Sequence, residues 1–153
     1  MTGVPQPIRD LVERTADAWR AALGERLRSV VLFGSWARGE ATDRSDVDLA
    51  VVVDPPSEGD WSRLCRPIGR DPEERPDVSI VLWSGAQLAA HPWLMIDVAT
   101  DGIIVLDDGR LRREMDDVRE RLRRYGSVRE YLPDGTWFWD LKPDWKPGDV
   151  IEI

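Results

Sequence analysis

The sequence has almost no cysteine or histidine. Its 153 residues include one cysteine, Cys65, and one histidine, His91. A lone cysteine cannot form an internal disulfide, and a zinc site of cysteine and histidine needs more ligands than these two residues supply. We therefore expect Cys65 to be a packing residue. His91 precedes a proline between two apolar helical segments, which favours a local structural role over catalysis.

Long apolar runs and a basic excess are also missing. No stretch approaches the roughly 20 apolar residues that a membrane-spanning helix needs. The beginning of the chain, MTGVPQPIRD, lacks the basic start and apolar stretch of a secretory signal. With 21 basic and 29 acidic residues, the net charge is -8. We expect a cytoplasmic protein with no membrane partner. The acidic balance argues against a nucleic-acid partner, although a local basic patch can still hold one phosphorylated ligand.

The composition is that of a globular protein, with 42% hydrophobic and 33% charged residues. A chain of this length is typical of one domain, so we expect a single domain over 1–153. Apolar patterns predict strands followed by turn residues at four places, over 29–34, 46–54, 77–83 and 103–108. They predict helices over 8–23, 61–68, 84–90, 93–100 and 110–125.

The last stretch, DGTWFWDLKPDWKPGDVIEI, is rich in tryptophan. It holds three of the eight tryptophans, several turn-forming residues and no repeat. Exposed aromatic side chains are favoured anchors at protein interfaces, so this tail is a candidate docking element. The alternative is a tail that folds back over its own core. We leave both possibilities open at this point.

Two aspartates begin the apolar strand predicted over 46–54. Because side chains alternate across a strand, Asp46 and Asp48 share one face. Asp77 begins the next predicted strand, so three carboxylates could converge. Such carboxylates repel one another unless a divalent cation lies between them, and oxygen ligands suit Mg²⁺. Mg²⁺ is commonly held by one or two carboxylates together with substrate phosphates, which indicates a nucleoside triphosphate.

A glycine-serine pair precedes the acids and fits the same chemistry. Gly34 lets backbone approach a phosphate closely, and Ser35 offers a hydroxyl donor. Arg38 and Arg44 could add positive charge. The alternative for every one of these residues is an ordinary structural role: solvated acids at strand ends, a turn acid after a proline, and solvated arginines in a polar loop.

The string GSWARGEATDRSDVDLAVVVD resembles the minimal nucleotidyltransferases of the DNA polymerase β-like superfamily. The signature is Gly-Ser followed after ten residues by Asp-x-Asp, here Gly34, Ser35, Asp46 and Asp48. The resemblance is most specific over 29–54 and follows the family's order of elements over about 8–107. It implies an α+β fold, with a mixed, mostly antiparallel sheet and helices packed on one face. The remaining residues, 108–153, would then form a helix and a tryptophan-rich extension.

The resemblance also implies a chemistry. It implies transfer of a nucleoside monophosphate from a triphosphate such as ATP, with release of pyrophosphate. Asp46, Asp48 and Asp77 would be the catalytic carboxylates and the ligands of two Mg²⁺ ions. Gly34, Ser35, Arg38 and Arg44 would bind the nucleotide.

The acceptor of the nucleotide is open among three hypotheses. In the first, the chain is an antitoxin that transfers AMP to a tyrosine of a separate HEPN-type toxin. In the second, it modifies a small hydroxylated molecule such as an aminoglycoside. In the third, it is a catalytically idle binding module, which the intact acids argue against. We favour the first hypothesis, because the residues after 107 are too few for the helical domain that completes a small-molecule pocket.

Overall fold

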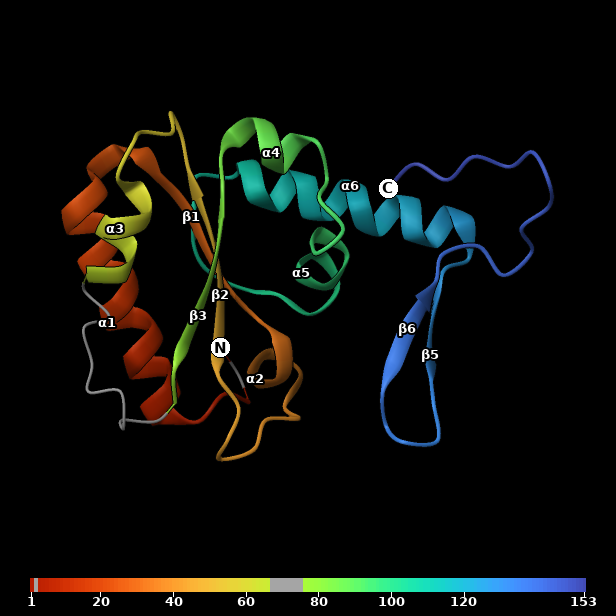
Figure 1. The fold of residues 1–153 in the computed structure, drawn as a ribbon, viewed down its shortest axis with the longest axis horizontal. Helices are drawn as coiled ribbons and strands as arrows, with labels where there is room; N and C mark the ends of the chain where they lie inside the picture. Colours follow the sequence, from red (N-terminus) through yellow and green to blue (C-terminus); the bar gives the residue numbers. More distant parts are fainter. Residues whose placement is uncertain (2, 67–75) are drawn as a thin grey trace.

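A mixed sheet of four strands forms the centre of the computed structural model, which describes residues 1, 3–66 and 76–153 (Figure 1). The strands are β1 (Leu27–Phe33), β2 (Val47–Val53), β3 (Val78–Trp83) and β4 (Ile103–Asp107). Their order across the sheet is β3-β2-β1-β4. β1 pairs antiparallel with β2 and with β4, whereas β2 and β3 are parallel. The predicted α+β fold with a mixed, mostly antiparallel sheet is confirmed.

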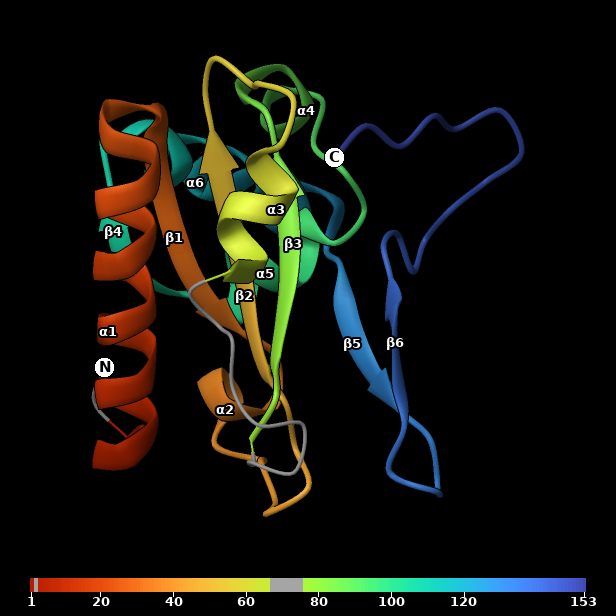
Figure 2. The same ribbon diagram turned by 60° about the vertical axis from the view of Figure 1, so that its left-hand side comes forward.

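Helices cover both faces of this sheet (Figures 1 and 2). They are α1 (Gln6–Leu23), α2 (Gly34–Arg38), α3 (Asp60–Cys65), α4 (Gly85–Ala89), α5 (Met95–Asp101) and α6 (Arg110–Tyr125), with a 3₁₀ turn η1 (Gly24–Arg26) after α1. Leu49 and Val51 of β2 pack in one core with α1 and α3. Ala50 and Val52 pack in a second core with α4, α5 and α6. The prediction of helices on one face is therefore wrong, because β2 is apolar on both sides beyond Asp48.

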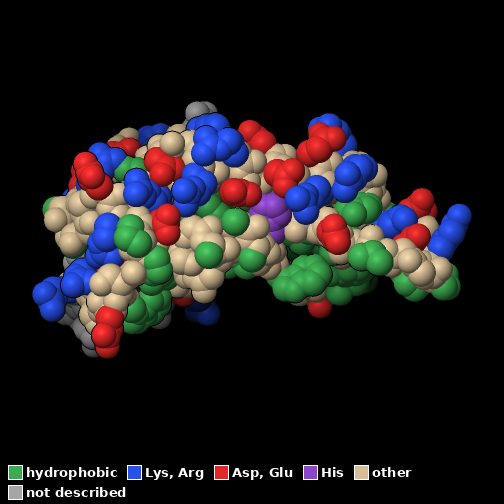
Figure 3. Space-filling view, turned by 90° about the horizontal axis from the view of Figure 1, so that it is seen from above, with side chains coloured by type: hydrophobic (Ala, Val, Ile, Leu, Met, Phe, Trp, Pro, Cys, Tyr) green, Lys and Arg blue, Asp and Glu red, His purple; other side chains and the backbone are tan. Residues whose placement is uncertain are grey.

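The two long helices predicted over 8–23 and 110–125 are present as α1 and α6, and each buries an apolar stripe. On α1 the buried side chains include Ile8, Val12 and Trp19, and the Trp19 indole donates to the Leu64 carbonyl over 2.7 Å. On α6 the buried stripe is Leu111, Met115, Val118 and Leu122. Charged side chains of both signs are interspersed on the molecular face shown in Figure 3. No helix in the described part of the chain is both long and apolar enough to span a membrane.

The shorter elements agree with the sequence in most respects. Ser84 caps α4 and forms a reciprocal capping box with Gln87. His91 follows α4, and its Nε2 lies 2.8 Å from Glu114 Oε2 on α6, which supports a structural role. The helix predicted over 61–68 runs from Asp60 to Cys65, and residues 67 and 68 lie outside the described residues.

Cys65 does not pack as predicted. It is exposed, because α3 turns Asp60 and Leu64 toward the core and the next position points to solvent. A helical rotation of about 100° per residue separates the buried Leu64 from its neighbour.

The first part of the tryptophan-rich tail forms a β-hairpin with the residues that precede it, a feature that the sequence did not predict. Strands β5 (Val128–Tyr131) and β6 (Trp137–Asp140) pair antiparallel and lie apart from the central sheet (Figure 1). Trp139 donates its indole N–H to Asp97 Oδ1 on α5 over 3.0 Å, and its side chain packs against the second core. For this tryptophan the tail folds back onto its own chain, whereas Trp145 stays 53% exposed.

Candidate functional site

The candidate site lies where β2 begins. In the parallel pairing of β2 with β3, Asp48 is opposite Ser79. One step earlier, the Val47 amide donates to the Asp77 carbonyl over 2.7 Å, which continues the same register toward Asp46. The sheet therefore brings the backbones of Asp46 and Asp77 to neighbouring strand starts.

Gly34 lies directly against the Asp48 carboxylate. Phe33, the last residue of β1, pairs with Asp48, so the chain turns into α2 just above that carboxylate. Gly34 has φ 74°, a left-handed conformation that side chains disfavour, and a Cβ there would collide with Asp48 Oδ2. Both the backbone conformation and the lack of space beside Asp48 therefore favour glycine at this position.

The environment of Asp48 favours a nearby cation. Burial raises the pKa of the Asp48 carboxyl above its ordinary value, and the charge of Asp46 raises it further. A hydrogen bond from Ser79 and the positive charge of Arg38 lower the pKa of Asp48 and so offset part of this rise. Ionised Asp46 and Asp48 together are therefore costly without a cation.

The Mg²⁺ predicted from the sequence would need oxygen ligands that lie close together. Among the residues that the structure describes, no group of three or more His, Cys, Asp or Glu side chains is close enough to hold a metal ion. Asp77 does not complete a preformed trio among the described residues, and the candidate donors are the Asp48 carboxylate and the Asp46 charge beside it. Two carboxylates fit Mg²⁺, because this ion commonly takes its remaining ligands from water and substrate phosphates.

Arg38 ends α2 and is held close to the site. Its Nε donates to Glu40 Oε2 over 2.6 Å, and its Nη1 lies 3.8 Å from Asp101 Oδ2 on α5. The guanidinium also lies over the Trp137 ring, 5.5 Å from the centroid. Only 17% of this side chain is exposed. A held guanidinium beside an acidic site is suited to an anionic ligand that a metal accompanies.

The loop between α2 and β2 is tied to α2 by Trp36. The Trp36 indole donates to the Ser45 carbonyl over 3.3 Å, and the Thr42 amide donates to Ser45 Oγ over 2.9 Å. Ser35 is half-buried in the first turn of α2, and Arg44 is exposed on the loop. The structure thus gathers Gly34, Arg38 and Asp48, and leaves Arg44 at the surface.

Ser79 and Asp101 were not among the residues predicted for the site. Ser79 follows Asp77 by two residues, so the alternation that joined Asp46 with Asp48 could have indicated it. Asp101 gave no such signal, because its pairing with Arg38 bridges two helices far apart in sequence.

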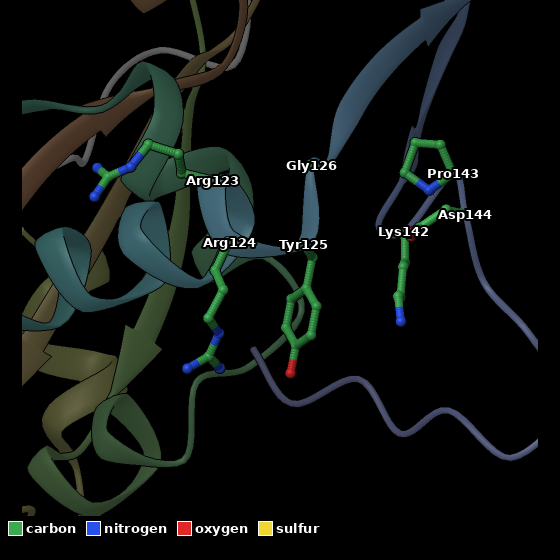
Figure 4. Close-up of a pocket in the computed structure, with 7 residues that line it drawn as sticks. All are labelled: Arg123, Arg124, Tyr125, Gly126, Lys142, Pro143 and Asp144. Atoms are coloured by element: carbon green, nitrogen blue, oxygen red, sulfur yellow. The ribbon is translucent and has the colours of Figure 1, made fainter.

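A surface hollow of about 600 Å³ lies elsewhere, between the end of α6 and the tail (Figure 4). The Arg124 guanidinium carbon lies 5.2 Å from the centroid of the Tyr125 ring, and Lys142 Nζ pairs with Asp149 Oδ2 at 2.6 Å. Arginines in the last turn of a helix complement the helix dipole. The charges of this hollow have local structural explanations, and its lining contains none of the acids of β2.

Comparison with known proteins gives the family. Residues 12–125 match the model of the nucleotidyltransferase domain. This chain belongs to that nucleotidyltransferase family. Asp46, Asp48 and the preceding glycine-serine pair all fall inside the matched residues, so the candidate site lies within a nucleotidyltransferase domain.

One relative and two solved structures extend the comparison. The "Putative protein adenylyltransferase" of Methanocaldococcus jannaschii is 35% identical over 43 residues, which span 28% of this chain and 43% of that relative's length. A crystal structure of a toxin-antitoxin with AMP-PNP superposes with a TM-score of 0.52 at 18% identity, over 73% of this chain and 87% of that one. The structure of spectinomycin adenyltransferase AAD(9) from Enterococcus faecialis, with ATP and spectinomycin, superposes with a TM-score of 0.52 at 14% identity. The match covers 76% of this chain and 68% of that one. These structural matches establish the polymerase β-like fold.

Proposed function

We propose that this nucleotidyltransferase is a Mg²⁺-dependent adenylyltransferase that moves AMP from ATP to a tyrosine hydroxyl of a partner protein. The partner would be a HEPN-type toxin, and the chain would act as its antitoxin. The observation that carries the proposal is the contact of Gly34 with the Asp48 carboxylate beside Asp46. This contact places a turn of backbone next to two acids whose joint ionisation calls for a cation.

Asp46 and Asp48 would hold the metal, with Asp77 as a third carboxylate once substrate is bound. Bound Mg²⁺ would neutralise charge on the phosphates and on the reacting oxygens. The two aspartates would also fix the position of the triphosphate relative to the sheet. The parallel register of β2 and β3 supports this role, because both strands start at the same end of the sheet.

Gly34, Ser35 and Arg38 would orient the nucleotide. The turn at Gly34 lets the backbone approach a phosphate without a side chain in the way. Ser35 would donate its hydroxyl, and Arg38 would pair with phosphate oxygens. Arg44 would reach the phosphates from the loop, where it is exposed.

The chemical step is an in-line displacement at phosphorus. The tyrosine oxygen of the acceptor forms a bond to the α-phosphorus of ATP, and the bond from that phosphorus to the bridging oxygen of the β-phosphate breaks. Pyrophosphate leaves with the electron pair of the broken bond. One of the aspartates beside the nucleophile accepts the phenolic proton.

Two comparisons support a protein acceptor. The curated relative is named for protein adenylylation. Structures with TM-scores of 0.52 and 0.51 are of toxin-antitoxin complexes, one with AMP-PNP and one named MntA-HpeT. Spectinomycin adenyltransferase has the same fold, so a small hydroxylated acceptor is the competing outcome.

The test is a transfer assay with ATP labelled at the α-phosphate. The purified chain is incubated with Mg²⁺ and a HEPN-type protein encoded beside it, and the products are analysed by mass spectrometry. We expect one or more AMP groups on a tyrosine of the neighbour and none when Asp48→Asn replaces the native chain. An unmodified neighbour together with an adenylylated aminoglycoside would reject the protein acceptor in favour of the small-molecule one.

A further inference from the structure

The C-terminal hairpin reaches back to the candidate nucleotide site. We propose that Asp101 and Trp137 are positioning residues, which together with Arg129 hold the Arg38 guanidinium beside Asp48. We call Asp101, Arg129 and Trp137 the Arg38 network. The inference rests on the proposed function, because it takes Arg38 as a ligand of the triphosphate. It adds a task for the hairpin, whose strands lie beyond residue 125, where the family match ends.

Asp101 is shared between two arginines. Arg129 Nη2 donates to Asp101 Oδ2 over 2.6 Å, and the same oxygen lies 3.8 Å from Arg38 Nη1. Both partners of the Arg129–Asp101 pair are largely buried, each with 14% of its side chain exposed. A shielded carboxylate attracts a nearby cation more strongly than an exposed one. Asp101 therefore draws Arg38 toward α5.

Trp137 contacts both arginines through its ring. Arg129 lies 4.4 Å from the Trp137 ring centroid, and Arg38 lies 5.5 Å from it. Arg129 is also 4.9 Å from the Trp139 centroid. These distances are within the range of cation–π attraction. The hairpin thus presents one aromatic ring to the arginine of α2 and to its own arginine.

The hairpin is itself anchored, so that it can serve as a support. Trp139 and Arg129 are paired across β5 and β6, and both bond to acids of α5 that are four residues apart, Asp97 and Asp101. On an α-helix, residues with this spacing lie on one face. The two bonds fix the hairpin against α5 in a defined register.

The network leaves Arg38 able to bind phosphate. The 3.8 Å separation of Arg38 from Asp101 is an ion pair too long for a hydrogen bond. The Arg38 guanidinium lies 5.5 Å from the centroid of the Trp137 ring. Its Nε–H donates to Glu40, so its Nη groups would be the ones that bind phosphate. Arginine loses much rotamer freedom when it is fixed, and a support that fixes it beforehand removes that cost from ligand binding. The expected consequence is tighter ATP binding.

The experiment has two readouts on the full-length chain. The first follows the Nη–H signals of Arg38 in protein labelled with ¹⁵N-arginine, assigned by their loss in Arg38→Lys, without nucleotide; the Nε–H is not used, because it donates to Glu40. We expect Trp137→Ala to speed exchange of the Nη protons with water about fivefold, because the guanidinium becomes mobile. Trp137→Phe should keep most of the protection. The matched control is Phe138→Ala, which removes an aromatic side chain from the opposite face of the same strand and should change nothing.

The second readout is the Kd of ATP in Mg²⁺, measured by calorimetry. Trp137→Ala and Asp101→Asn should each weaken ATP binding about tenfold, and Trp137→Phe should restore it to within about twofold. In an Arg38→Ala background, Trp137→Ala should have no further effect, because it acts through Arg38.

The outcomes separate this inference from the proposed function. Unchanged exchange at Arg38 in Trp137→Ala overturns the inference. So does an equal loss of ATP affinity on Trp137→Ala with and without Arg38, which would indicate general damage to the fold. Tighter ATP binding in Trp137→Ala would overturn it in favour of an inhibitory hairpin. If exchange changes as expected but neither Arg38→Ala nor Trp137→Ala affects ATP binding, the triphosphate role of Arg38 in the proposed function is wrong and its positioning by the hairpin stands.

Discussion

Gly34 and Asp48 are so close that a single methyl group on the glycine would overlap the aspartate carboxylate. Gly34 directly follows Phe33, the last residue of β1, and Asp48 belongs to β2, so the antiparallel pairing of Phe33 with Asp48 makes the contact. The residues between the glycine-serine pair and the acids form the rest of α2 and a loop. This segment returns the chain to the end of the sheet at which β1 finishes.

Replacing Gly34 with alanine should damage both stability and activity. The substitution adds a side chain at φ 74° and pushes the Asp48 carboxylate aside. We expect a loss of about 2–3 kcal/mol in the free energy of unfolding, measured by urea denaturation, and no detectable AMP transfer. Gly126→Ala is the control, since Gly126 has φ 67° with no atom within 4 Å of an added Cβ. A similar loss in both variants would show that backbone strain alone accounts for the effect.

Asp48→Asn should abolish transfer and yet stabilise the metal-free protein at neutral pH. A folded-state pKa that is raised by burial and by Asp46 means that ionised Asp48 destabilises the fold above that pKa. In EDTA at pH 7, the variant should melt roughly 2 °C higher than the native chain. The gain should shrink as the pH falls toward the unfolded-state pKa of about 3.9, where native Asp48 is protonated as well. A lower melting temperature for Asp48→Asn at pH 7 would contradict the electrostatic account.

ATP should stabilise the fold only together with a divalent cation. The two carboxylates and the triphosphate repel one another, so binding needs the cation. With Mg²⁺ and ATP at 100 times its Kd, binding should add about 2.7 kcal/mol to the free energy of unfolding. A thermal melt in EDTA should show no shift with ATP. An equal shift in EDTA would remove the metal from the proposed site.

Asp60 should confer resistance to acid. It is buried, and bonds from both Nη atoms of Arg26, at 2.9 and 2.8 Å, are the main reason why the pKa of its carboxyl is lowered. Because the pKa is lower in the folded state, ionised Asp60 stabilises the fold at any pH above the unfolded-state pKa of about 3.9. This stabilisation is lost as the pH falls through the folded-state pKa.

Asp60→Asn should therefore lower the melting temperature at pH 7 by about 5 °C, with a difference that narrows below pH ~4. Asp144→Asn, at an exposed position of the tail, is the control and should melt like the native chain. A constant difference between pH 7 and pH 3 would mean that the Asp60 charge is not what stabilises the fold.

The sequence alone determined the four strands of the central sheet, the two long helices and the position of the candidate acid site along the chain. Local rules were sufficient for this. Alternation placed Asp46 and Asp48 on one face, and apolar patterns predicted the helices over 8–23 and 110–125, which the structure has as α1 and α6. Each of these features depends on residues a few positions apart, and such residues are neighbours in any fold that contains the element.

Only the tertiary structure decided which distant residues meet at that site. The second helical layer, the Ser79 hydroxyl opposite Asp48 and the docking of the hairpin on α5 were not predictable from local patterns. Arg38, Asp101 and Trp137 come from two helices and a strand that are separated by dozens of residues. Their approach depends on the packing of whole elements against the sheet, and no spacing in the sequence encodes it.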